Sequence, residues 1–160
     1  MKKIIAAVSL LLAAFAAPAS AETPFYAGLQ VGDGVTVLGG YQFNKMFAGQ
    51  LEYTSYGSHS GYSGCGLANC GNYASANSLG LFGVATVPLN LQGLPGLSVF
   101  GKAGLVHTTV SVWGYTFTDN SFVLGGGAQY DFTPQVSARL GLDLNSYYSD
   151  NLYIGALVRF

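Results

Sequence analysis

The chain has 160 residues, of which 50% are hydrophobic and 14% aromatic but only 8% charged. An average soluble domain carries about 25% charged residues, so this surface is not built to face water on all sides. Disorder is excluded, because disordered chains are rich in charge and poor in aromatic residues. The formal net charge of -1 provides no basic patch for a nucleic acid, and we expect no nucleic acid as a partner.

Residues 1–21 are predicted to be a secretory signal peptide. Lys2 and Lys3 form a basic start, an apolar stretch runs from Ile4 to Ala17, and Ala19-Ser20-Ala21 matches an A-x-A cleavage site. The alternative is a membrane anchor, but an apolar stretch of about 14 residues falls short of the ~20 that a spanning helix needs. We therefore expect cleavage of this segment and export across the inner membrane.

The remaining residues, 22–160, show the pattern of a transmembrane β-barrel. Segments of about ten residues alternate apolar side chains with polar or small ones, as strands do between lipid and lumen. The alternating segments are Phe25–Gly32, Val35–Phe43, Phe47–Tyr56, Leu79–Val87, Leu97–Leu105, Phe122–Phe132, Val136–Asn145 and Leu152–Phe160. Apart from a helix, a closed barrel is the only structure that satisfies its backbone inside lipid. We predict an all-β fold, an eight-stranded antiparallel up-and-down transmembrane barrel.

Connection lengths assign the two ends of this barrel, if the N-terminus lies in the periplasm. The periplasmic turns are then Asn44–Met46, Leu89–Gly96 and Thr133-Pro134. The outer loops are predicted at Asp33-Gly34, Gly57–Ala76, Trp113–Ser121 and Ser146–Asp150. Most outer loops exceed most inner turns in length, which is typical of outer-membrane barrels.

Five phenylalanines support this orientation, because each is predicted to point outward at a periplasmic strand end. They are Phe25, Phe43, Phe47, Phe132 and Phe160. An aromatic girdle at one membrane interface has this arrangement. A soluble β-sandwich also alternates, but it gives no reason for the five rings to lie together.

The chain resembles the OmpA-type eight-stranded outer-membrane barrels. The resemblance rests on GGYQFNKMFAGQLEYTSYG (Gly39–Gly57), LGGGAQYDFTPQVSARLGLDL (Leu124–Leu144) and the closing segment NLYIGALVRF. It implies the outer membrane of a Gram-negative-type bacterium, with lipids and lipopolysaccharide as surroundings. Phe160 is similar to the terminal signal read by the barrel-assembly machinery. Because the chain given ends at Phe160, we expect no peptidoglycan-binding domain and no anchoring to the cell wall.

Inward-facing charges form the candidate site. Glu52, Lys102 and Arg139 are predicted at similar height near mid-barrel, where Glu52 would bridge the two cations, because so narrow an interior is filled by side chains. Asp143 is predicted higher and Asp131 lower, in a polar column with Gln30, Gln42, Gln50 and Gln129. The resemblance implies a cluster that gates a narrow pore. A purely structural plug and a gated conduit both remain open.

Cys65 and Cys70 lie in the second outer loop, in a C-x4-C spacing. A local disulfide is predicted, since the periplasm is oxidising. A metal site with His59 is the alternative, but it falls below the usual four ligands of a structural site. We expect no metal and no cofactor.

The alternative function is a lipid A-modifying enzyme, an acyltransferase or deacylase. Its candidate residues are His59 with Ser58 or Ser60, and His107 near Thr108 and Thr109. A Gly-rich loop is poorly suited to the preorganised geometry of catalysis. We therefore predict a monomeric protein without enzymatic activity. Its expected role is structural, or a narrow low-conductance pore, or an interaction with an extracellular ligand through the outer loops.

Overall fold

The computed structural model describes residues 24–56, 74–89, 91–112, 115–145 and 150–160. The strands, in chain order, are β1 (Phe25–Val31), β2 (Val35–Gln42), β3 (Phe47–Ser55), β4 (Ala74–Pro88), β5 (Leu97–Val112), β6 (Tyr115–Asp131), β7 (Val136–Asn145) and β8 (Asn151–Arg159). No helix long and apolar enough to span a membrane occurs among these residues. The predicted signal peptide lies outside the described residues.

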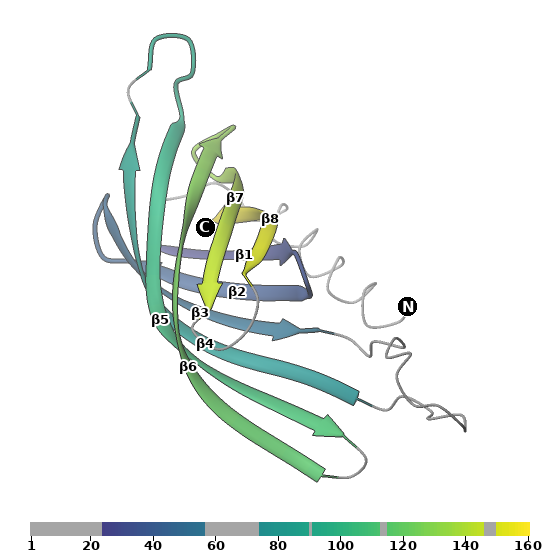
Figure 1. The fold of residues 1–160 in the computed structure, drawn as a ribbon. Helices are drawn as coiled ribbons and strands as arrows, with labels where there is room; N and C mark the ends of the chain where they lie inside the picture. The colour runs from purple at the N-terminus through teal and green to yellow at the C-terminus, as the bar shows by residue number, and fades with distance from the viewer. Residues whose placement is uncertain (1–23, 57–73, 90, 113–114, 146–149) are drawn as a thin grey trace.

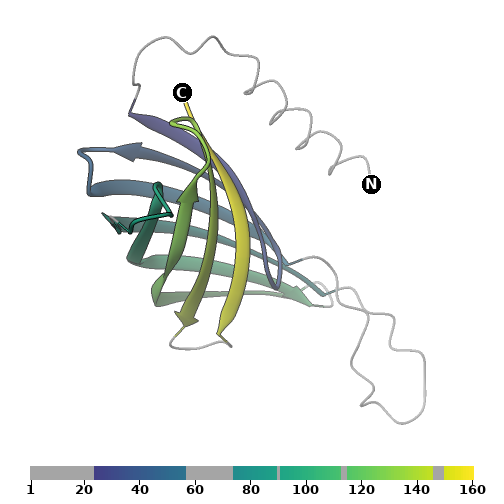
Figure 2. The same ribbon diagram turned by 90° about the horizontal axis from the view of Figure 1, so that it is seen from above.

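The strands close into a single barrel in chain order (Figures 1 and 2). Each strand pairs antiparallel with the next, and β1 pairs antiparallel with β8, with Ala27 opposite Val158. The Phe160 N–H donates to the Phe25 carbonyl at 3.1 Å and extends this seam. The predicted all-β, eight-stranded, up-and-down barrel is confirmed.

Alternation along each strand separates an apolar outer face from an inner face that carries the polar groups. On β3, Leu51 and Tyr53 are about half exposed, at 51% and 49%, whereas Gln50 and Glu52 between them are buried. The other strands show the same arrangement. Their apolar side chains lie outside, which is the reverse of the arrangement in a soluble protein. Lipid is the solvent for which such an outer face is suited.

Apolar side chains form two buried clusters in the lumen. One buried cluster contains Phe82, Val84, Phe100, Val106, Val123 and Tyr153, and a second contains Tyr26, Leu38 and Leu157. Ala48 packs against both clusters. Glycines make this filling feasible: a Cβ on Gly40 would overlap the Tyr26 ring, so the aromatic ring occupies the space that a side chain would need.

Short turns connect the strands at the end where the girdle was predicted. In the turn 43–46, the Asn44 side chain accepts hydrogen bonds from the Met46 and Phe47 N–H groups, at 2.8 and 2.9 Å. The turn 132–135 is held in the same way by the Thr133 hydroxyl, which accepts from the Val136 N–H at 3.0 Å. The longer turn 89–96 ends on Gly96, whose φ of 100° favours glycine.

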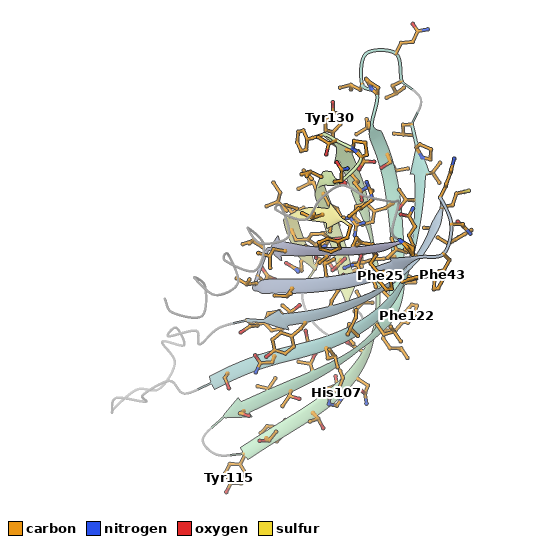
Figure 3. All side chains as sticks on the ribbon, turned by 180° about the vertical axis from the view of Figure 1, so that it is seen from behind. Phe25, Phe43, His107, Tyr115, Phe122 and Tyr130 are labelled. Carbon is orange, nitrogen blue, oxygen red and sulfur yellow. The ribbon has the colours of Figure 1, made fainter. Side chains whose placement is uncertain are left out.

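The five girdle phenylalanines are exposed, as predicted, and lie at strand ends on this side of the barrel. Their exposed fractions run from 40% to 67% for Phe160, Phe47, Phe25, Phe132 and Phe43. Phe25 and Phe43 both make edge-to-face contacts with Tyr41, with ring centroids 5.1 and 5.4 Å apart. Figure 3 shows Phe25 and Phe43 far from Tyr115, which lies at the tip of the β5–β6 hairpin.

The prediction of an outer loop at Trp113–Ser121 is wrong. β6 begins at Tyr115, and it pairs with β5 from Val112–Tyr115 onward. β4 likewise begins at Ala74, inside the predicted loop Gly57–Ala76. Residues 115–118 are Tyr, Thr, Phe and Thr, which favour strands. As Figure 1 shows, β4, β5 and β6 therefore extend beyond the outer ends of β1 and β2.

Candidate functional site: the charged lumen

Four charged side chains project into the middle of the lumen from three strands. Glu52 lies on β3, Lys102 on β5, and both Arg139 and Asp143 on β7. Glu52, Lys102 and Arg139 are 6%, 3% and 4% exposed. Charges buried to this degree are costly unless they are paired and hydrogen-bonded, so their partners determine what the site can do.

Lys102 is the centre of the site. Its Nζ lies 2.7 Å from Glu52 Oε1 and 2.9 Å from Asp143 Oδ2, and its side chain is fully buried. The ammonium also lies over the rings of Phe82 and Tyr153, 4.5 and 4.9 Å from their centroids. This Lys102 cluster, defined as Lys102, Glu52 and Asp143, spans the lumen between β3, β5 and β7.

Arg139 does not join that cluster directly. Its Nε and Nη2 donate to Gln129 Oε1 at 3.2 and 2.9 Å, and its guanidinium lies 4.3 Å from the Phe100 centroid. In the described part of the chain, the ion pairs join Lys102 to its two carboxylates and Arg159 to Asp131. The expected bridge from Glu52 to both cations is therefore wrong as a direct contact, and Asp143 takes the place expected for Arg139.

Gln50 lies between the two cations. Its Oε1 accepts from Arg139 Nη1 at 3.2 Å and from the Tyr26 hydroxyl at 2.9 Å, while its Nε2 donates to Glu52 Oε1 at 2.6 Å. The side chain is 1% exposed. One neutral amide thus connects the Arg139 guanidinium to the Glu52 carboxylate. The sequence pattern placed Gln50 in the polar column, but it carried no signal for this connecting role.

A second ion pair lies closer to the periplasmic end. Arg159 Nη2 is 3.3 Å from Asp131 Oδ1, and Gln129 Nε2 donates to the same oxygen at 2.9 Å. Since Gln129 also accepts from Arg139, the polar network continues from mid-lumen to this rim. Asp131 lies below the Lys102 cluster, where the sequence predicted it.

A cavity of about 280 Å³ occupies the outer half of the lumen. Glu52 and Asp143 line it, together with Gln30, Thr54, Ser78 and Thr108 among others. Two buried polar atoms of lining residues, Gln30 Nε2 and Asp143 Oδ1, have no hydrogen-bond partner among the described residues. The lumen therefore has a polar outer half that ends on the Lys102 cluster, and a more tightly filled region below it.

The other candidate residues lie elsewhere. Cys65, Cys70, His59, Ser58 and Ser60 fall outside the described residues, so the disulfide stays a prediction. His107 lies on the outer face of β5, and its Nδ1 is 2.8 Å from Asn120 Oδ1. Within the described residues, no group of three His, Cys, Asp or Glu side chains could hold a metal ion.

Comparison with solved structures finds several eight-stranded barrels with the same fold. The N-terminal barrel of Pseudomonas aeruginosa OprF is 17% identical, with a TM-score of 0.59 over 85% of this chain and 95% of that one. Neisserial surface protein A is 18% identical, with a TM-score of 0.52 over 88% of this chain and 100% of that one. Ail of Yersinia pestis in a nanodisc is 16% identical, with a TM-score of 0.54 over 85% of this chain and 97% of that one.

No curated protein sequence shows significant similarity to the chain. The family model of the outer membrane protein beta-barrel domain matches residues 4–160. That range contains every strand of the barrel and every residue of the lumenal network. The chain belongs to the outer membrane protein beta-barrel domain family.

Proposed function

We propose that this outer-membrane barrel has a structural and cell-surface role, and that its lumen is closed at mid-height. The observation that carries the proposal is the double ion pair of Lys102 with Glu52 and Asp143. Three strands contribute to this contact, so it ties opposite walls of the barrel together. An eight-stranded barrel is also just wide enough for its interior to be filled by side chains.

Planar-bilayer recording tests closure. With a closed lumen, purified protein adds no discrete conductance to the lipid baseline. Lys102→Met should then lower the free energy of unfolding by about 3–5 kcal/mol, because two buried carboxylates lose their cation, yet leave the conductance at baseline. Lys45→Met, at an exposed turn position, is the matched control and should change neither quantity. Discrete openings of the wild-type protein would contradict closure.

A gated narrow pore is the second candidate, and the cavity above the Lys102 cluster favours it. Solvent that fills this cavity would be separated from the periplasm by the cluster and the side chains below it. If the cluster is a gate, Glu52→Gln should raise the single-channel conductance as well as lower stability. A loss of stability with unchanged conductance would support the structural plug instead.

We further propose that the protein catalyses no lipid A modification. His107 has an amide partner, Asn120, and that pair lies on the outer face of the barrel. An orienting carboxylate, which would raise the basicity of a catalytic histidine, is not among the described contacts of His107. Incubation of the refolded protein with lipid A, followed by mass spectrometry, should show no change in acyl chains. Release or transfer of a chain that His107→Ala abolishes would overturn this.

Export and insertion complete the proposal. Residues 1–21 would be removed as a signal peptide during export, and Phe160 would be recognised by the barrel-assembly machinery. The apolar outer face supports contact with membrane lipids and lipopolysaccharide as a monomer. N-terminal sequencing of the protein from outer membranes should begin at Glu22.

A further inference from the structure

The polarity of β4, β5 and β6 reverses in their outer segments. Near mid-barrel the outward residues are apolar, as at Leu79, Leu105 and Leu124. Farther out, the residues on the same outer face are polar: Ser75, Asn77, Thr109, Ser111, Thr116 and Thr118. Beyond the inward-facing Ser78, Thr108 and Asp119, the inner face becomes apolar instead, with Ala76, Val110, Tyr115 and Phe117.

This reversal marks the end of the lipid-facing region. Leu79, His107 and Asn120 are cross-strand neighbours and form a row on the outer face. This row separates the apolar part of the outer face from the polar part. Beyond it, a polar outer face is suited to water and an apolar inner face is not. Tyr115 and Phe117 are 72% and 64% exposed on that inner face, and Figure 3 shows Tyr115 at the tip and His107 nearer the barrel.

The outer segment of β6 also has an edge that is open among the described strands. The ladder between β6 and β7 begins at Val123–Asn145, so Tyr115–Ser121 pairs only with β5 among the described strands. The orientation of the backbone follows from the other end of β6, where the Asp131 N–H bonds to Gly96 and the Phe132 N–H to Val136. Even-numbered residues therefore direct their N–H groups to the β7 side, because the β5–β6 register is unbroken.

Thr116, Thr118 and Asn120 thus present backbone donors and acceptors at the open edge. Exposed edges are usually protected by lysine, proline or a bulge. Residues 115–121 contain neither lysine nor proline, and their one charge is Asp119. The Asp119 side chain lies on the inner face, and no described residue forms an ion pair with it.

We propose that this edge binds an extended segment of an extracellular protein, which adds to β6 as an antiparallel strand. Its side chains opposite Tyr115 and Phe117 would be apolar, those opposite Thr116 and Thr118 polar, and the one opposite Asp119 basic. From N- to C-terminus, the partner therefore reads basic–polar–apolar–polar–apolar. Main-chain hydrogen bonds provide affinity in such strand addition, and alternate side chains provide specificity.

A second copy in the same membrane fits this edge less well. All copies in one membrane carry β6 in the same direction, so two such edges would meet in parallel. Parallel pairing is the less stable arrangement per residue, whereas a separate segment can approach in the antiparallel direction. The inference rests on the proposed surface role, but it makes no demand on the lumen.

Fluorescence anisotropy with single barrels in nanodiscs tests the proposal. The probe is a labelled peptide, Ser-Thr-Lys-Thr-Val-Thr-Val, and the control peptide is Thr-Lys-Val-Val-Thr-Ser-Thr, which has the same composition without the alternation. The first should bind, and the second should bind at least about tenfold more weakly, because its valines no longer lie opposite Tyr115 and Phe117 and its lysine no longer lies opposite Asp119. Equal binding, or no binding of the first peptide, would overturn the proposal.

Substitutions at the edge locate the binding. Thr118→Pro removes a backbone donor at the open edge but no hydrogen bond to β5. It should weaken binding of the first peptide about tenfold. Thr118→Val keeps the donor and should bind like the wild type. Asp119→Lys should shift the preference to a peptide with Glu in place of Lys. Unchanged binding by both Thr118→Pro and Asp119→Lys would contradict the assignment, as would association between nanodiscs in place of peptide binding. Conductance is measured separately, so failure here leaves the closed lumen unaffected.

Discussion

Lys102 and Asp143 meet across the backbone of Gly125. Lys102 is paired with Gly125 in the β5–β6 ladder, and Gly125 is paired with Asp143 in the β6–β7 ladder. Lys102 Nζ and Asp143 Oδ2 lie 2.9 Å apart next to this glycine. A Cβ on Gly125 would overlap the Asp143 carboxylate and lie 3.1 Å from Lys102 Cε. The absence of a side chain at this position is thus a condition for the ion pair.

Gly125→Ala should therefore destabilise the barrel. The added methyl group must displace Asp143 or the β6 backbone, and overpacking of this kind costs about 1–3 kcal/mol. Urea unfolding in lipid vesicles measures the loss. Gly101→Ala is the control, because its Cβ would meet nothing closer than 3.9 Å. Equal stability of the two variants would show that Lys102 and Asp143 do not meet over Gly125.

Gln50→Met should be among the costly substitutions in the lumen. It preserves the approximate size of the side chain but removes the acceptor of Arg139 and Tyr26 and the donor to Glu52. Each buried group left unsatisfied costs about 1–3 kcal/mol. The same unfolding assay applies, with Gln42→Met at the half-buried end of β2 as the matched control. A loss of stability no larger than that of Gln42→Met would show that Gln50 does not connect Arg139 to Glu52.

The reversal of polarity on β6 predicts that an arginine on the outer face of this strand destabilises the barrel by an amount that depends on its depth in the membrane. Leu124→Arg places a charge on the lipid face and should cost about 2–4 kcal/mol. Thr118→Arg lies on the same face beyond the reversal and should be nearly neutral. Refolding into bilayers compares the two. Similar costs would move the membrane boundary outward past Thr118.

Phe160 is expected to act during assembly more than in the folded state. Its ring is 40% exposed, so Phe160→Ser removes little packing within the barrel. Assembly in cells should fall, as measured by the heat-modifiable fraction in outer membranes, while purified protein still refolds into detergent. Phe132→Ser, an exposed ring on the same rim, is the control. Equal assembly of the two variants would show that Phe160 carries no special signal.

The architecture could be predicted from the sequence, because a strand with lipid on one side and a narrow lumen on the other must alternate with a period of two. From Val136 to Asn145 that alternation assigns Leu140 to the outside and Arg139 to the inside, and the structure agrees. The same rule failed at Tyr115–Ser121. There the strand leaves the lipid and its two faces exchange polarity. The expected alternation therefore stops, and the sequence pattern was interpreted as a loop although the strand continues.

Which inward charges meet could not be predicted from the sequence and depends on the closed barrel. Alternation places Glu52, Lys102, Arg139 and Asp143 in the lumen, but the stagger between strands sets their relative heights, and that stagger is a property of the closed sheet. It brings Asp143 to Lys102 across Gly125 and leaves Gln50 between Arg139 and Glu52. Contacts between residues as much as 89 positions apart depend on how the barrel closes, and no local pattern encodes them.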